Sequence, residues 1–162
     1  MPLSKKIVLL GHFGVGKTSL VRQYVDGAFS EDYLVTIGVQ VKKKDLEIDK
    51  TQISLIIWDV EGNMAISRGR KSYLLGSHGF VYVFDVTRPE TFENLVSEVL
   101  YLKENYPNIP VKIVGNKSDL IDSNHVKEFF QKQEFKDCHF TSAKNGDNVD
   151  LVFMEITKKM IE

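Results

Sequence analysis

The stretch GHFGVGKT, residues 11–18, constrains the fold of this chain more than any other part of the sequence. It fits the pattern G-x-x-x-x-G-K-[ST] and lies between an apolar run, residues 7–10, and a helix-like segment, residues 19–25. Strand, glycine-rich loop and helix in this order predict a loop whose backbone amides, with the following helix N-terminus, hold phosphate groups. A chance glycine-rich turn is the alternative, and the flanking strand and helix make it the weaker interpretation.

Two side chains of this loop have the chemistry that a phosphate site needs. The Lys17 ammonium is expected to reach the β- and γ-phosphate oxygens of a nucleotide, and the Thr18 hydroxyl is expected to ligate Mg²⁺. The residues of the loop and helix start that we expect to bind the phosphates are Phe13, Gly14, Val15, Gly16, Lys17, Thr18 and Ser19.

The length and charge of the chain limit the remaining possibilities. Its 162 residues suit one small domain over residues 1–162, and a net charge of -1 favours neither nucleic acid nor an acidic membrane surface as a partner. Cys138 is the sole cysteine of the sequence, which excludes an intramolecular disulfide, fits a cytoplasmic location and suggests a small core residue. The final residues carry no Cys-a-a-X box, so we expect no encoded lipid anchor in this chain.

Apolar runs bounded by turn residues alternate with helix-like stretches along the chain. Strands are expected at residues 7–10, 38–48, 51–58, 80–84, 111–114 and 139–140, and helices at 19–25, 89–106, 125–132 and 149–160. The short Asp49-Lys50 connection predicts an antiparallel hairpin. The expected fold class is therefore α/β, a P-loop domain with a six-stranded, mostly parallel mixed sheet and helices on both faces. Such sheets bind ligands at the carboxyl ends of their strands.

The motif WDVEG, residues 58–62, lies at the end of the third predicted strand. An acidic residue at that point is the expected partner of the metal at a phosphate loop, usually through water, so Asp59 is the candidate. Gly62 is expected to offer a backbone N–H to the γ-phosphate, because a glycine lets the backbone come close. The pattern D-x-x-G is common when it stands alone, and its pairing with the phosphate loop makes it moderately specific.

The motif NKSD, residues 116–119, lies at the end of the fifth predicted strand. The Asp119 carboxylate can accept two hydrogen bonds, and guanine presents two adjacent donors where adenine presents an acceptor. A buried mismatch of this kind costs roughly 1–3 kcal/mol, so Asp119 favours guanine over adenine. The Lys117 stem is expected to lie across the base while its ammonium braces neighbouring loops. In TSAK, residues 141–144, the Ala143 amide is expected to donate to the guanine oxygen.

Three such loops in this order resemble those of the Ras-like small GTPases, and VTIGV, WD-x-x-G, YVFDVT, VGNKSD and TSAK look closest to the Rab branch. The resemblance covers essentially the whole chain as a G domain. It implies GTP and GDP with Mg²⁺ as ligands, a molecular switch that hydrolyses GTP, and effectors, exchange factors and GTPase-activating proteins as partners. On the base side it implies contacts from Asn116, Lys117, Asp119, Leu120, Ser142, Ala143 and Lys144.

The resemblance also assigns residues to two switch segments. It implies that Thr36 is the switch I threonine, which ligates Mg²⁺ and donates its amide to the γ-phosphate in the GTP state only. Tyr33 is then expected over the phosphates and Phe29 against the guanine, whereas without the other motifs these three residues would suggest a strand entry and two core aromatics. Residues 63–73 correspond to switch II. The residues implied in catalysis are Lys17, Thr36, Gly62 and Asn63.

Three residues on the phosphate side depart from the family pattern. Asn63 stands where the family usually has the glutamine that orients the attacking water, and its amide is one methylene shorter, a misplacement that can cost about 10²-fold. Glu61 replaces a small alanine, and its charge disfavours the closed GTP state unless it turns away or meets a cation. The Phe13 ring stands where the family has a small residue and can obstruct an arginine finger. We therefore expect slow hydrolysis.

Two alternative functions remain open from the sequence. The first is a hydrolysis-deficient module that binds GDP or GTP without useful turnover, which the same three departures support. The second is a P-loop kinase or ATPase, against which Asp119 and Lys117 argue.

Residues 41–44 are expected at the surface of the molecule. Val41 stands where Rab proteins usually place a phenylalanine of a surface aromatic triad, and Trp58 and Tyr73 keep its other two members. The following run of Lys42, Lys43 and Lys44 is interpreted as an exposed strand face or edge guard rather than a binding patch.

Overall fold

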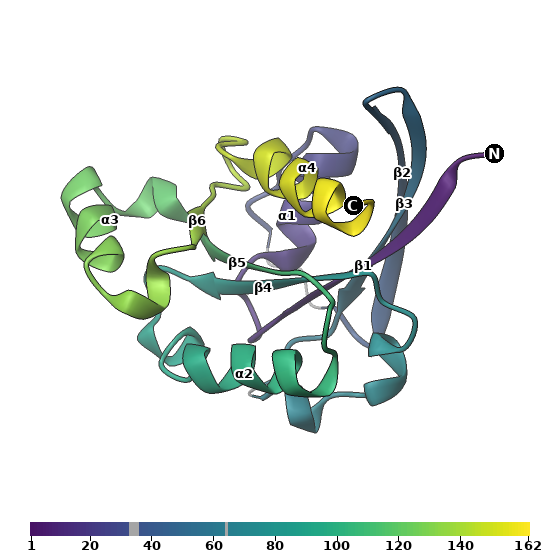
Figure 1. The fold of residues 1–162 in the computed structure, drawn as a ribbon. Helices are drawn as coiled ribbons and strands as arrows, with labels where there is room; N and C mark the ends of the chain where they lie inside the picture. Colours follow the sequence, from purple (N-terminus) through teal and green to yellow (C-terminus); the bar gives the residue numbers. More distant parts are fainter. Residues whose placement is uncertain (33–35, 64) are drawn as a thin grey trace.

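The computed structural model describes residues 1–32, 36–63 and 65–162, and these contain six strands and four α-helices (Figure 1). The strands are β1 (Leu3–Gly11), β2 (Val39–Ile48), β3 (Thr51–Val60), β4 (Gly79–Asp85), β5 (Val111–Asn116) and β6 (His139–Phe140). The helices are α1 (Lys17–Asp26), α2 (Leu95–Asn105), α3 (Ser123–Phe130) and α4 (Val149–Met160). Short 3₁₀ helices are η1 (Ile66–Arg68), η2 (Lys71–Leu74), η3 (Pro89–Thr91), η4 (Ser118–Leu120) and η5 (Gln133–Phe135).

The strands form one sheet in the order β2-β3-β1-β4-β5-β6. Every neighbouring pair is parallel except β2 and β3, which pair antiparallel. In Figure 1, α1 and α4 lie on one side of the sheet and α2 lies on the other. The predicted six-stranded, mostly parallel mixed sheet with helices on both faces is therefore confirmed.

The β2–β3 hairpin follows from its two turn residues. Asp49 and Lys50 have φ values of 50° and 66°, and Ile48 pairs directly with Thr51, which is the geometry of a two-residue turn with left-handed central residues. This arrangement leaves β2 at the edge of the sheet.

The lysines of β2 suit that edge position. Lys42 and Lys43 are exposed and lie near the carboxylates of Asp26 and Asp45. The Lys44 ammonium lies 3.9 Å from the centre of the Tyr24 ring and donates to the Tyr24 carbonyl. The interpretation as an exposed strand face or edge guard therefore fits Lys42 and Lys43, whereas Lys44 is half-buried against α1.

The predicted helix over residues 89–106 is wrong in its first part. The structure has η3, a three-residue turn and then α2 from Leu95. The buried Thr91 hydroxyl accepts from the Asp85 amide at 2.9 Å and holds the chain against the end of β4. Phe92 then leaves the helical region with φ -135° and ψ 3°, and its ring packs against Phe84.

Several strands are longer than their apolar runs predict. β3 extends two residues past Trp58, because Asp59 and Val60 still pair with Gln40 and Val39 of β2. Asp59 is therefore fixed within the sheet, close to the strand's carboxyl end. β5 likewise extends to Asn116, so the first residue of NKSD belongs to the strand.

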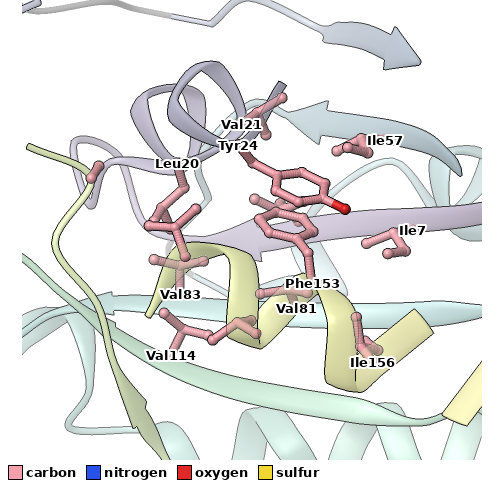
Figure 2. Packing of buried hydrophobic residues seen from close by; sticks show 14 of the residues in the cluster. Ile7, Leu20, Val21, Tyr24, Ile57, Val81, Val83, Val114, Phe153 and Ile156 are labelled. Carbon is pink, nitrogen blue, oxygen red and sulfur yellow. The ribbon is translucent and has the colours of Figure 1, made fainter. Parts of the chain in front are cut away.

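Two apolar clusters cover the two faces of the sheet. The first contains residues of α1, α4 and the sheet, and Tyr24 and Phe153 stack at its centre with ring centroids 4.1 Å apart (Figure 2). The second contains residues of α2, α3 and the opposite face, with an aromatic group around Phe84. Cys138 belongs to this second cluster and is 6% exposed, as expected for a core residue. Across the described ranges, every helix falls short of the length and apolar character that crossing a membrane requires.

Candidate functional site

A cavity of about 310 Å³ opens at the carboxyl edge of the sheet, within the range of small-ligand sites. The residues predicted from the sequence that line it are Phe13, Gly14, Gly16, Lys17, Thr18, Ser19, Phe29, Thr36, Gly62, Asn116, Lys117, Asp119, Leu120, Ala143 and Lys144. Ser30, Glu31 and Asp32 also line it and were not predicted. Their position directly after Phe29 in the same loop is the signal that could have found them.

The glycine loop needs Gly16 for a steric reason. Gly16 is the N-cap of α1 with φ 99°, and a Cβ there would lie 2.3 Å from Nδ2 of Asn116. That amide nitrogen donates to the Val15 carbonyl at 3.0 Å, which joins the loop to the end of β5. Because the N-cap residue is a glycine, it has no side chain that could cap the first backbone amides of α1. These amides can therefore donate to an anion. The Val15 side chain itself is in the core and does not line the cavity.

The Lys17 side chain folds back along the glycine loop. Its ammonium donates to the carbonyls of His12 at 3.1 Å and Gly11 at 3.4 Å, and the residue is 6% exposed. Burial lowers the pKa of Lys17 to about 8, and the nearby Asp59 carboxylate partly opposes this shift. A cation is therefore held between the loop and the cavity, where it can meet an anionic ligand.

Three oxygen-bearing side chains from three separate segments meet beside Lys17. The Thr18 hydroxyl lies 2.7 Å from the Thr36 hydroxyl and donates to Oδ2 of Asp59 at 2.5 Å. Thr36 donates to the same carboxylate oxygen at 3.4 Å. Because these side chains converge, the structure brings together all three residues predicted to bind metal.

The environment of Asp59 fits a hard cation. The residue is 2% exposed, and its Oδ1 is buried with no hydrogen-bond partner among the described residues. Burial raises the pKa of the Asp59 carboxyl, whereas its hydrogen bond from Thr18 and the charge of Lys17 lower it. Carboxylate and hydroxyl oxygens are what Mg²⁺ prefers, so Thr18, Thr36 and Asp59 are the residues that would hold it.

Gly62 packs directly against the glycine loop. A Cβ at this position would lie 2.5 Å from the Phe13 nitrogen and 2.7 Å from the His12 carbonyl carbon. The next amide, that of Asn63, donates to the Gly11 carbonyl at 3.2 Å. The segment after β3 is thus held against the loop by a contact that only glycine permits.

Replacing Gly62 by alanine is expected to push this segment off the glycine loop. Overpacking of this kind costs about 1–3 kcal/mol, so urea unfolding should show a lower midpoint with an unchanged slope. Hydrogen exchange at the Asn63 amide should also become faster. Gly69→Ala is the matched control, because its Cβ would meet its nearest neighbours at 3.3 Å. Equal destabilisation by the two variants would contradict this account.

The side chains of Glu61 and Asn63 do not enter the cavity. Oε2 of Glu61 accepts from the Gly38 amide at 3.0 Å, so this carboxylate turns away from the phosphate side. The sequence-based expectation that its charge disfavours a closed state excepted a side chain that turns away, and this exception applies here because a backbone N–H takes up the carboxylate. Nδ2 of Asn63 donates to the Glu61 carbonyl at 3.0 Å, and Asn63 lines a smaller hollow beneath η1 instead.

The NKSD and TSAK loops meet at the other end of the cavity. Ser142 is fully buried, and its hydroxyl donates to Oδ1 of Asp119 at 2.8 Å, which orients that carboxylate. The Lys117 ammonium lies 2.8 Å from the Gly14 carbonyl and 2.9 Å from the Asp85 carboxylate, so it braces the neighbouring loops as expected. The Ala143 amide, which was expected to donate to a base, donates to Oδ1 of Asn116 at 3.2 Å in this structure.

Apolar groups and one ion pair close the sides of the cavity. Phe29 and Leu120 are 38% and 61% exposed and line it, so Phe29 is not the core aromatic that the alternative interpretation suggested. Lys144 and Glu31 approach to 3.3 Å across its mouth. Thr36 precedes β2 and is not a strand residue. Tyr33 lies outside the described residues, so its predicted position over the phosphates is untested.

A glycine loop, a helix N-terminus and a cavity at the carboxyl edge of a mostly parallel sheet define a P-loop nucleotide-binding protein. Residues 6–162 match the family model described as the Ras family, which covers nearly the whole chain. The chain therefore belongs to the Ras family. Proteins of this family are GTP-binding switches that bind GTP or GDP with Mg²⁺ and engage regulators and effectors.

Proposed function

We propose that this protein is a guanine-nucleotide switch that hydrolyses GTP slowly and signals through switch I, which contains Thr36, and switch II, residues 63–73. The observation that carries the proposal is the convergence of Lys17, the Thr18–Thr36–Asp59 group and Asp119 around one cavity. Lys17 would neutralise the phosphates, and the two hydroxyls with the carboxylate would hold Mg²⁺. When bound, that ion supplies positive charge that stabilises the developing charge on the transferred phosphoryl group.

Recognition of the base is proposed for Asp119. Ser142 occupies one carboxylate oxygen and fixes the plane of the group, while the exposed remainder faces the cavity. Phe29 and the Lys117 stem offer flat apolar surfaces for a purine ring. The Ala143 amide would share its proton between Asn116 and the base oxygen, since its present bond is long.

Slow hydrolysis is supported by what faces the phosphate end. The side-chain amide of Asn63 donates to the Glu61 carbonyl, and Asn63 lies outside the cavity lining, so this side chain is not in place to orient a water molecule. The Phe13 ring is 52% exposed at the cavity rim, where it would obstruct a residue inserted by an activating partner. Both features bear on the rate and leave nucleotide binding intact.

Asn63→Gln is expected to raise single-turnover GTP hydrolysis by about 10- to 100-fold, because the longer side chain recovers the missing reach. The rate is measured as phosphate released from labelled GTP, with Asn105→Gln on the exposed end of α2 as the matched control. A wild-type rate equal to that of a glutamine-bearing relative, and unchanged in Asn63→Gln, would remove the proposal of slow hydrolysis. Identifying the nucleotide that co-purifies, and comparing GTP, GDP and ATP in the same assay, tests the switch itself.

A second candidate is an interaction module that binds GDP and GTP but does not hydrolyse GTP at a useful rate. The placement of Asn63 outside the cavity favours it. Bound GTP that persists over many hours, in wild type and in Asn63→Gln alike, would select this candidate.

We also propose a Rab-like partner surface over β2, β3 and η2. Trp58 and Tyr73 lie with ring centroids 6.3 Å apart, and Val41 is opposite Trp58 in the β2–β3 ladder and 51% exposed. Nearby, Ile37 and Leu75 are 86% and 68% exposed. Effectors that recognise this surface would meet a flatter apolar patch than one bearing phenylalanine at position 41.

A further inference from the structure

Glu61 joins the two segments that flank the phosphate end of the cavity. Its amide donates to the Gly38 carbonyl at 2.8 Å, and its carboxylate accepts from the Gly38 amide at 3.0 Å. The regular β2–β3 ladder ends one step earlier, with Val39 opposite Val60. The Glu61–Gly38 pair therefore extends the hairpin by one residue, with a side chain providing the second hydrogen bond.

This pair acts close to the residues that would bind the metal. Gly38 is two residues from Thr36, whose hydroxyl lies beside Thr18 and Asp59. Between them Ile37 is 86% exposed and contributes almost no packing. Among the described residues, Thr36 is therefore held by the oxygen group at its own side chain and by the Glu61–Gly38 pair two residues further on.

The side-chain half of the pair is specific to the glutamate. The hydrogen bond from the Glu61 amide to Gly38 is a backbone bond that any residue at position 61 could make. The bond that the Gly38 amide donates requires an acceptor of the reach of a glutamate or glutamine side chain. A small residue at position 61 would leave that amide to water.

We propose that Glu61 is a positioning residue: through the Gly38 amide it holds Thr36 at the metal group whether or not a γ-phosphate is bound. This inference rests on the proposed nucleotide switch and deepens it. In a switch, the γ-phosphate orders the segment that carries the threonine, and hydrolysis releases it. Here a carboxylate of the protein supplies part of that ordering, so residues 36–38 stay closed in the GDP state. Compared with a protein that has a small residue at position 61, the GDP form then retains Mg²⁺ more tightly and its residues 36–38 differ less from those of the GTP form.

The direct test is hydrogen exchange at the assigned Gly38 amide in the Mg²⁺–GDP form. A hydrogen bond to a charged group is worth about ten- to hundredfold in an equilibrium, so Glu61→Ala should lower the protection of this amide by about that factor. Glu61→Gln keeps an acceptor of the same length and should restore protection to within about threefold of wild type. Glu47→Ala, which removes an exposed carboxylate elsewhere in β2, is the matched control and should leave the Gly38 amide unchanged.

The second readout is the affinity of the GDP form for Mg²⁺, measured by titration of the ion. It should weaken about three- to tenfold in Glu61→Ala and recover in Glu61→Gln, a pattern that a general loss of stability would not produce. Unchanged Gly38 protection and unchanged Mg²⁺ affinity in Glu61→Ala would overturn the inference. If the protein failed to bind GDP, the switch itself would fall, and Gly38 exchange in the free protein would still decide whether the Glu61 contact exists.

Discussion

Replacing Asp119 by alanine is expected to abolish the preference for guanine over adenine nucleotides. A carboxylate that accepts two hydrogen bonds from the base would contribute about 3–6 kcal/mol, so GDP affinity should fall roughly 10²- to 10⁴-fold. ADP binding should stay as weak as in wild type, because adenine does not present those donors. Competition of GDP and ADP against a fluorescent guanine nucleotide measures both affinities.

Two further variants separate recognition by Asp119 from general damage. Ser142→Ala removes the hydroxyl that orients this carboxylate and should give a smaller loss of GDP affinity. Glu128→Gln removes an exposed carboxylate from neighbouring α3 and should change neither nucleotide. An Asp119→Ala protein that still prefers GDP to ADP would refute the assignment of the base site.

Gly16→Ala is expected to impair both folding and nucleotide binding. The new methyl group would meet the buried Asn116 amide, and the backbone is already at φ 99°. The left-handed conformation costs about 1–2 kcal/mol and the overlap about 1–3 kcal/mol, so the free energy of unfolding should fall by roughly 2–5 kcal/mol. Displacing Asn116 also breaks its bond to the Val15 carbonyl, and GDP affinity should fall about tenfold or more.

Gly27→Ala is the matched control for this variant. Gly27 ends α1 with φ 65°, and a Cβ there would meet nothing within 4 Å. It should therefore cost only the backbone penalty of about 1–2 kcal/mol and leave GDP affinity unchanged. Urea unfolding followed by the fluorescence of Trp58 compares the two variants. Equal losses would show that the contact with Asn116 carries no weight.

Much of the fold could be predicted because the local signals agree with one another. Asp49 and Lys50 predict the hairpin, and the apolar runs predict the six strands that the sheet contains. The helix prediction over residues 89–106 was wrong at its start, because the Thr91 hydroxyl bonds to Asp85, which precedes it by six residues. Spacing of apolar residues does not report a side-chain bond of that kind.

The candidate site could be located from its motifs, but the directions of its side chains could not. The motif places the Glu61 charge near phosphate, and only the structure reveals the Gly38 amide that accommodates it. Asn63 was expected at the cavity because of its place in the motif, whereas its side chain donates to the Glu61 carbonyl, two residues earlier in the chain. Such choices depend on backbone groups that become neighbours only when the hairpin and the glycine loop come together.

The Lys117 ammonium has a consequence for how a bound ligand leaves. It contacts the Gly14 carbonyl in the glycine loop and the Asp85 carboxylate at the end of β4, while Lys117 also lines the end of the cavity where the NKSD and TSAK loops meet. One side chain thus contacts both the glycine loop and the opposite end of the cavity. Displacement of the loop around position 117 would therefore also remove a contact of the glycine loop at the opposite end of the cavity.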